Sequence, residues 1–395
     1  MKVNRNIVMT YCSFILSPFL SLPFLWVQLR KGVDKGAVFL ISILMGMLSA
    51  KYIPTITNDK SRYIERYDLF SNYSFTDLIT YFVSVSRPDY LFDSLNYFFS
   101  RLGFDVRYFF FIITFLTVYL NFIFLKKMVD KSCNGSFIYN NTTFLLVLSS
   151  ISFVGLFSGM RFAFAGSFFL GFIYLFYFSK SYIRAFLLLV ITLSIHFSYA
   201  LLITGIFLTL FNPKAKTIKF FLILSLLFFI LPKGVLEGIL GALSLPSGYS
   251  SKADIYINFD RESSENGKIL TYIKNAWFYF AILHLLLHRH HYNNKLYIIV
   301  SILAIFINFM YPVPIAFNRY ISFYKIIFAG YLIYMILTNN IKRSLFYGFL
   351  FLYIVGLSTD MLVLRVNFSE SYNLSEIWSI FYTFAEAKEP HKFLY

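Results

Sequence analysis

Charged residues and cysteines are both scarce in this chain of 395 residues. Only 14% of the residues are charged and 58% are hydrophobic, which excludes a soluble globular domain. Two cysteines, Cys12 and Cys133, are too few for a disulfide framework or a cysteine metal site. The net charge of +16 does not indicate binding to nucleic acid, because the basic residues lie in short connections between apolar runs.

Long apolar runs recur along the whole chain and predict an all-α polytopic membrane protein, with a single membrane domain over 1–395. The runs are continuous and lack the alternation of a membrane β-barrel. We expect no cleavable signal peptide, because the first run is too long and no cleavage site follows it. About ten spanning helices are expected, at 7–29, 36–53, 107–125, 138–158, 162–178, 217–231, 269–287, 296–314, 320–338 and 344–364.

The run 185–211 is unusual because it is basic on both flanks. The positive-inside rule places both flanks in the cytoplasm, together with the four other basic connections, so the run must return to the side that it left. A straight helix over this run would be about 40 Å long, against roughly 30 Å of hydrocarbon. We therefore expect a re-entrant or two-armed hairpin with His196 near its apex, in preference to one long tilted helix.

Most acidic residues fall in two loops on the opposite, outer side. The first loop, 54–106, is expected to hold surface helices at 74–86 and 90–102, the latter capped by Asp89 and ended by Gly103. The second loop, 233–268, is polar and is expected to be a mobile flap. The tail 365–395 is also expected outside, with a short helix at 374–384.

Three ionisable residues interrupt apolar sequence: Arg161, His196 and Arg319. Such a group costs roughly 2.5–3.5 kcal/mol if it faces lipid at depth, so each one indicates a site lined by protein or water. In the expected topology all three lie in the outer half of the membrane, and both arginines stand near a helix N-terminus. Guanidinium groups and helix N-termini both favour phosphate, so a lipid-linked phosphate or diphosphate is the expected partner. The alternatives are interfacial anchors for the arginines and a packed core residue for the histidine.

Several neighbours are further candidates for the same site. Lys325 is either a second cation of the diphosphate site or a structural partner of Asp360. Asp59 either activates an acceptor hydroxyl or is a solvated charge paired with Lys60 or Arg62. The tyrosines considered for sugar binding are Tyr63, Tyr67 and Tyr320, although a place in the aromatic belt of the membrane surface explains most tyrosines of the chain.

The order of these motifs resembles the EpsG/Wzy group of polysaccharide polymerases, which includes the O-antigen polymerases. The resemblance covers roughly 55–330, and Phe162 follows Arg161 where that family usually has glutamine. The motifs are Asp59…Tyr63…Tyr67, Pro88-Asp89…Phe92…Leu95 with Gly103, Met160-Arg161-Phe162-Ala163-Phe164-Ala165, Ile195-His196-Phe197-Ser198 and Asn318-Arg319-Tyr320.

The resemblance implies a glycosyltransferase of the membrane-embedded C type in the bacterial inner membrane, with its active site facing the periplasm. It would transfer a growing glycan from undecaprenyl diphosphate to the non-reducing end of a new undecaprenyl-diphosphate-linked repeat unit. A chain-length regulator protein is the expected partner. Arg161 and Arg319 would stabilise the leaving diphosphate, His196 or Asp59 would accept the proton, and neither a metal nor another cofactor is needed.

Three other functions use some of the same features. An O-antigen ligase, or another glycosyltransferase that uses a lipid carrier, shares the arginines and the histidine. A flippase or transporter for lipid-linked glycans would show internal duplication and a charged through-path, and the sequence shows neither. An integral-membrane acyltransferase would need a second fixed acid or amide beside His196, and none is evident.

Overall fold

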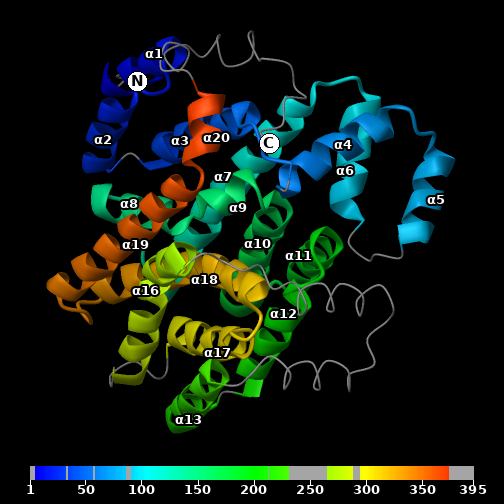
Figure 1. Cartoon of the computed structure of the whole chain (residues 1–395). Coiled ribbons are helices and arrows are strands. Elements are labelled where there is room, and N and C mark those ends of the chain that lie inside the picture. Colours follow the sequence, from blue (N-terminus) through cyan, green and yellow to red (C-terminus); the bar gives the residue numbers. More distant parts are fainter. Residues whose placement is uncertain are drawn as a thin grey trace.

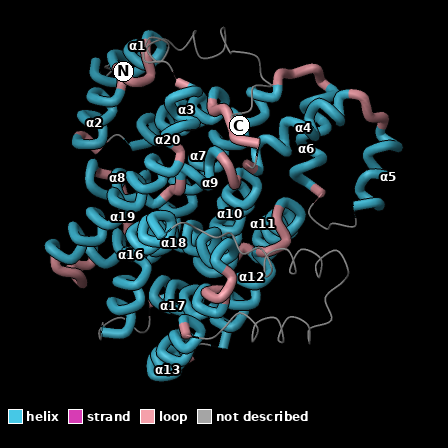
Figure 2. Tube along the Cα trace, viewed as in Figure 1, coloured by secondary structure: helices cyan, strands magenta, loops and turns pink. Residues whose placement is uncertain are grey.

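The computed structural model describes residues 5–32, 34–56, 58–85, 90–211, 213–230, 265–287 and 294–372. Every regular element within these ranges is a helix (Figures 1 and 2), which confirms the all-α prediction. The expected flap 233–268 falls almost entirely outside the described residues, as do Asp89 and the expected helix 374–384.

Five described helices are long and apolar enough to cross a membrane, so the chain is a polytopic membrane protein. The central one is α18 (Pro314–Leu337), because 83% of its apolar stretch is buried in the protein, against 39% to 56% in the other four. The others are α7 (Val106–Cys133), α10 (Met160–Ile173) with its π-helical end η1 (Tyr174–Ser179), α16 (Glu265–Leu287) and α19 (Arg343–Val363).

Other apolar runs form shorter or broken helices, so the expected count of about ten straight spans is not established. The run 7–29 divides into α1 (Arg5–Leu16) and α2 (Leu22–Arg30), because Pro18 has no N–H to continue the first helix. The run 138–158 divides into α8 (Asn141–Ser150) and α9 (Phe153–Phe157). The remaining elements are α3 (Asp34–Lys51), α13 (Ala215–Ser225) with η3 (Leu226–Phe229), and α17 (Lys295–Phe309).

The run 185–211 forms two helices that run in opposite directions along α10. They are α11 (Tyr182–Ile195) and α12 (Tyr199–Leu208), which η2 (Thr209–Phe211) extends. The far ends of both arms contact one ring, since Phe176 lies 5.7 Å from Tyr182 and 5.7 Å from Phe207. The chain thus reverses between Ile195 and Tyr199, as the basic flanks predicted.

Basic connections on both sides of this hairpin meet at one end of the bundle. Lys295 donates to the carbonyl of Tyr177, at the end of α10, and Lys219 donates to the carbonyl of Leu286, at the end of α16. These contacts agree with the expectation that the connections share one side of the membrane.

The first outer loop contains three helices that stand beside the bundle (Figure 1): α4 (Asp59–Ser71), α5 (Phe75–Val85) and α6 (Leu91–Arg101). The two expected helices are present, and Gly103, at φ +73°, follows the end of α6. The sequence did not predict α4, which Asn58 caps by accepting from the Lys60 N–H. Side-chain amide and hydroxyl groups of α6 fix it to α4, since Asn96 donates to the Tyr63 carbonyl and Ser100 to that of Tyr67.

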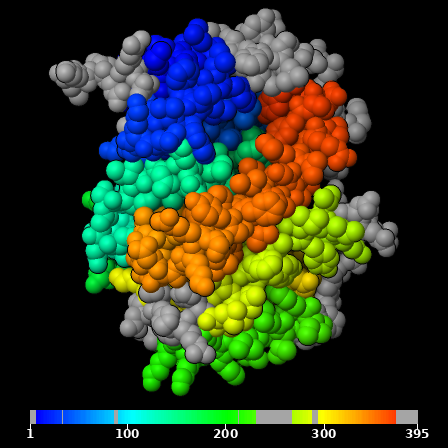
Figure 3. All heavy atoms as spheres, turned by 90° about the vertical axis from the view of Figure 1, so that its left-hand side faces the viewer, coloured from blue at the N-terminus to red at the C-terminus, as the bar shows by residue number. Residues whose placement is uncertain are grey.

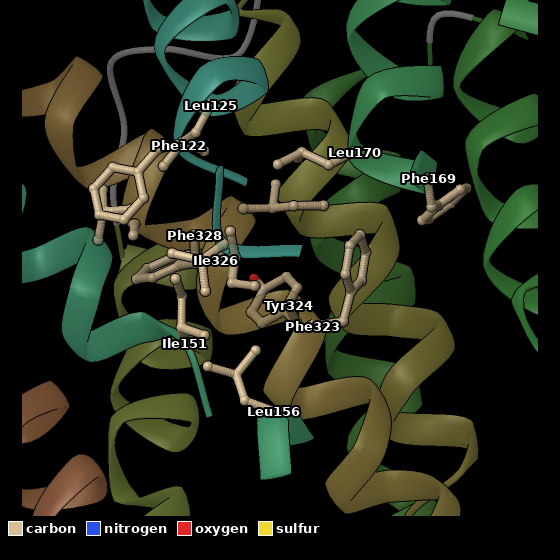
Figure 4. Packing of buried hydrophobic residues seen from close by; sticks show 14 of the residues in the cluster. Phe122, Leu125, Ile151, Leu156, Phe169, Leu170, Phe323, Tyr324, Ile326 and Phe328 are labelled. Atoms are coloured by element: carbon tan, nitrogen blue, oxygen red, sulfur yellow. The ribbon is translucent and has the colours of Figure 1, made fainter. Parts of the chain in front are cut away.

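The core lies where α7, α8, α9, α10 and α18 meet, as Figure 4 shows for Phe122, Leu125, Ile151, Leu156, Phe169, Leu170, Phe323, Tyr324, Ile326 and Phe328. On one face, α19 (orange in Figure 3) crosses between α8 and α16. Beyond it, α20 (Arg365–Ser371) is fixed to the segment that follows α3, because Asn367 donates to the carbonyl of Ile53 and Ser371 accepts from its N–H.

Candidate active site

Arg319 and Asp59 form an ion pair, although 260 residues separate them in the sequence. Arg319 stands in the second turn of α18, and its Nη2 lies 3.0 Å from Asp59 Oδ2. The other oxygen of Asp59, the first residue of α4, lies 2.6 Å from Nη2 of Arg62. The structure therefore brings two predicted site residues together, and each oxygen of the carboxylate contacts a guanidinium.

Tyr63 lies one turn after Asp59, on the same face of α4. Its ring is 5% exposed and packs against Phe92. Burial raises the pKa of Tyr63 to about 12; Arg161 lowers this pKa, Asp59 raises it, Arg319 lowers it and Asp93 raises it. Both predicted arginines thus act on one buried hydroxyl from different helices.

Arg161 is the second residue of α10, and the segment that follows it holds the apex of the hairpin. The ring of Phe162 lies 5.3 Å from that of His196, and the Phe162 carbonyl accepts a hydrogen bond from Tyr199 Oη at 3.1 Å. Gly166 permits this contact, because a Cβ there would lie only 2.5 Å from Tyr199 Oη. The small residues of this stretch therefore allow the close helix packing that the sequence indicated.

His196 stands at the break between α11 and α12, with extended backbone at φ −152° and ψ 102°. Its Nδ1 lies 2.7 Å from Oγ of Ser198, which fixes the orientation of the imidazole. Tyr320 Oη donates to the Ser198 carbonyl at 2.7 Å, and the Tyr320 ring packs on Phe162. The segments that carry Arg161, His196 and Arg319 consequently meet at one place.

Lys325 does not join this group. Its side chain is buried and donates from Nζ to the carbonyls of Ser149, at 2.8 Å, and Tyr353, at 3.2 Å. The carboxylate of Asp360 instead pairs with Lys274 and accepts from Oγ of Ser152 at 2.6 Å. These hydrogen bonds join α18 to α8 and α19, and Asp360 lies within electrostatic reach of Lys325 without accepting a hydrogen bond from it among the described contacts.

The three tyrosines considered for sugar binding are all packed against protein, with 5% to 6% of each exposed. Tyr67 donates to the carbonyl of Phe104, and Tyr320 to that of Ser198. Their ring faces are therefore not open for stacking on a sugar in this conformation.

Sequence reasoning missed the pair formed by Arg66 of α4 and Asp93 of α6, whose Nη1 and Oδ1 lie 3.0 Å apart. The sequence places both residues in the outer loop 54–106 and gives neither of them a partner. The available signal was the spacing of Asp59, Tyr63 and Arg66, which share one face once the segment is a helix.

The model of the EpsG family matches residues 10–373. The chain belongs to the EpsG family. No curated protein and no solved structure gave a match. EpsG membership confirms the resemblance read from the motifs, and with the apolar helices it indicates a membrane protein of the polysaccharide polymerase type.

Proposed function

We propose that this EpsG protein is an O-antigen polymerase of the bacterial inner membrane. It transfers a growing glycan from undecaprenyl diphosphate to the non-reducing end of a new undecaprenyl-diphosphate-linked repeat unit, at the periplasmic face. The observation that carries the proposal is the convergence of the Arg161, His196 and Arg319 segments beside α4. A C-type glycosyltransferase fold and a chain-length regulator as partner belong to the same proposal.

The arginines bind and stabilise the diphosphate of the donor. Negative charge develops on this leaving group as the sugar is transferred, and two fixed guanidinium groups favour that charge without a metal ion. Asp59 contacts Arg319 in the ligand-free protein at 3.0 Å. A phosphate oxygen arriving at Arg319 would replace that carboxylate as its partner, which releases one oxygen of Asp59.

The attacking sugar hydroxyl must lose a proton, and two residues are placed to accept it. His196 stands at the apex of the hairpin with its Nδ1 2.7 Å from Oγ of Ser198, and its imidazole is the first candidate. Asp59 is the second candidate once a phosphate has replaced it at Arg319. General-base catalysis contributes about 10²–10⁴-fold to a rate, so loss of the true base is measurable.

Loss of polymer length tests this proposal. Arg161→Ala and Arg319→Ala, expressed at the wild-type level, should restrict the surface glycan to a single repeat unit, because loss of one such donor costs about 10²–10³-fold in rate. Arg365→Ala is the matched control, since Arg365 is exposed in α20 and should leave the ladder of long chains unchanged. Normal ladders in both site variants would refute the assignment.

A ligase is the alternative that shares the same residues. Membranes that contain the protein should make long chains from lipid-linked repeat units alone, without lipid A core. Product formed only when the core is added would identify a ligase, and movement of the glycan across the membrane without a new glycosidic bond would identify a flippase.

A further inference from the structure

Two buried polar residues that the proposed mechanism does not use, Asp360 and Asn275, each fix a segment that leads to an arginine of the site. Asp360 lies on α19 and Asn275 on α16, and these helices pack against each other (Figure 1). Lys274, the residue before Asn275, pairs with Asp360, and its Nζ lies 2.5 Å from Oδ1 of the carboxylate. The supports of both segments therefore start from one place on α16.

Asp360 fixes the start of α9. Its side chain is only 3% exposed, and its Oδ2 accepts from Oγ of Ser152 at 2.6 Å and from the N–H of Val154 at 3.4 Å. Oγ of Ser152 in turn accepts from the N–H of Gly155 at 3.2 Å. A buried carboxylate is stable only where it is paired and hydrogen-bonded, so Lys274 and Ser152 together hold Asp360 in one orientation.

Helix α9 packs directly on the first turns of α10, which carry Arg161. The N–H of Gly159 donates to the carbonyl of Val154 at 3.0 Å. A Cβ added to Gly159 would lie 3.8 Å from Cα of Gly155, and one added to Gly155 would lie 3.9 Å from Cβ of Ala163. The two helices are thus in close contact here, so a displacement of α9 would move the turn that holds Arg161.

Asn275 fixes the turn of α18 that carries Arg319. It is 2% exposed, and its Nδ2 donates to Oδ1 of Asn318, the residue before Arg319, at 2.7 Å. One turn later on α16, the ring of Phe278 packs on that of Phe317 at 5.8 Å. A hydrogen bond and a ring contact therefore hold the two residues before Arg319 against α16.

A diphosphate bound by guanidinium groups from two helices requires that both helices keep their places, because a binding site tolerates displacements of only about 0.5 Å. We propose that Asp360 and Asn275 are positioning residues of the diphosphate site, which set where the segments of Arg161 and Arg319 stand relative to each other. The inference rests on the proposed function, since the diphosphate is the ligand that requires this spacing. Each residue acts through the segment that it fixes, without contact with the ligand.

Direct binding tests the role of Asn275. The full-length protein, purified in detergent, is titrated with farnesyl diphosphate as the probe. Asn275→Leu should bind it about 10- to 100-fold more weakly than the wild type, as expected for loss of hydrogen bonds to a charged group. The control is Asn308→Leu: Asn308 is also buried and donates to Oγ of Ser225 at 2.8 Å, but it joins α17 to α13. This control should lose thermal stability and keep the wild-type affinity.

Two double variants of equal charge test the role of Asp360. Lys274→Met/Asp360→Asn removes the ion pair but keeps an oxygen that accepts from Ser152, whereas Lys274→Met/Asp360→Leu keeps none. Neither leaves one member of the buried pair without the other, and any effect on Lys325 is common to both. The first should bind farnesyl diphosphate as the wild type does, and the second about 10- to 100-fold more weakly. Amide hydrogen exchange over 153–163 should be faster in the second variant alone.

All variants are compared well below their unfolding temperatures, so that lost affinity reports a displaced arginine and not an unfolded protein. Wild-type affinity in Asn275→Leu, equal affinity in the two double variants, or an equal loss in Asn308→Leu would overturn the inference alone. A wild-type protein that does not bind farnesyl diphosphate would overturn both the inference and the proposed function.

Discussion

Gly166 offers the sharpest test of how the hairpin is held against α10. In Gly166→Ala the new Cβ would lie 2.5 Å from Tyr199 Oη and 3.0 Å from a ring carbon of Phe323. Neither ring has space to move, because Tyr199 is fully buried and stacks on Phe162 at 4.8 Å. Overpacking of this kind costs about 1–3 kcal/mol of folding free energy. The hydrogen bond from Tyr199 to Phe162, which is worth about 0.5–1.5 kcal/mol, would also be lost.

A second substitution makes this expectation specific. Tyr199→Phe removes the oxygen that the new methyl group would meet, so the double variant Gly166→Ala/Tyr199→Phe should lose less stability than the sum of the two single variants. Thermal unfolding in detergent measures the stabilities, and chain-length profiles report whether His196 remains in place.

Gly348→Ala is the matched control, because no atom lies within 4 Å of the Cβ it would add to α19. It should be as stable as the wild type or slightly more so, since alanine is the better helix former. If Gly166→Ala behaved like this control, the close packing of the hairpin on α10 would be refuted.

Two further predictions concern the start of α4. Asp59→Asn removes the carboxylate that contacts Arg319, so farnesyl diphosphate should bind at least as tightly as to the wild type; weaker binding would show that Asp59 orients Arg319 instead of competing for it. Lys60→Met removes the Nζ that donates to the carbonyls of Ser49 and Tyr52 at the end of α3. Two buried acceptors would lose their partner, at about 1–3 kcal/mol each, so its unfolding temperature should fall, whereas Lys131→Met on the exposed surface of α7 should unfold like the wild type.

The sequence alone identifies those residues of the candidate site that place an ionisable group inside an apolar run. Arg161, His196 and Arg319 each stand in a context that lipid would not tolerate, and that conflict is visible without a structure. The reversal of the hairpin followed in the same way, from basic residues on both of its flanks.

Features that depend on the direction of a side chain around its helix could not be found so easily. Lys325 follows Arg319 by six residues, which turns it by about 240° around α18 and directs it to α8 and α19. The sequence alone shows only that Arg319 and Lys325 are close along one helix, which favours a place for both in one site. Helix breaks were a second difficulty, because Pro18 and the cap at Ser152 interrupt runs whose composition is uniformly apolar.

Helix α4 was missed for a different reason. Its outward face is charged, and the apolar residues that it buries acquire their environment from other helices, as Tyr63 does from Phe92 of α6. The part of the site that lies on α4 therefore depends on tertiary packing that no pattern in the segment itself records.

A density map of the protein with a bound polyprenyl diphosphate is the most direct test of the central claim. The account predicts the diphosphate within hydrogen-bond distance of the guanidinium groups of both Arg161 and Arg319, with the attached sugar toward His196. A diphosphate bound among the lysines at the opposite end of the bundle, with Arg319 still on Asp59, would contradict it.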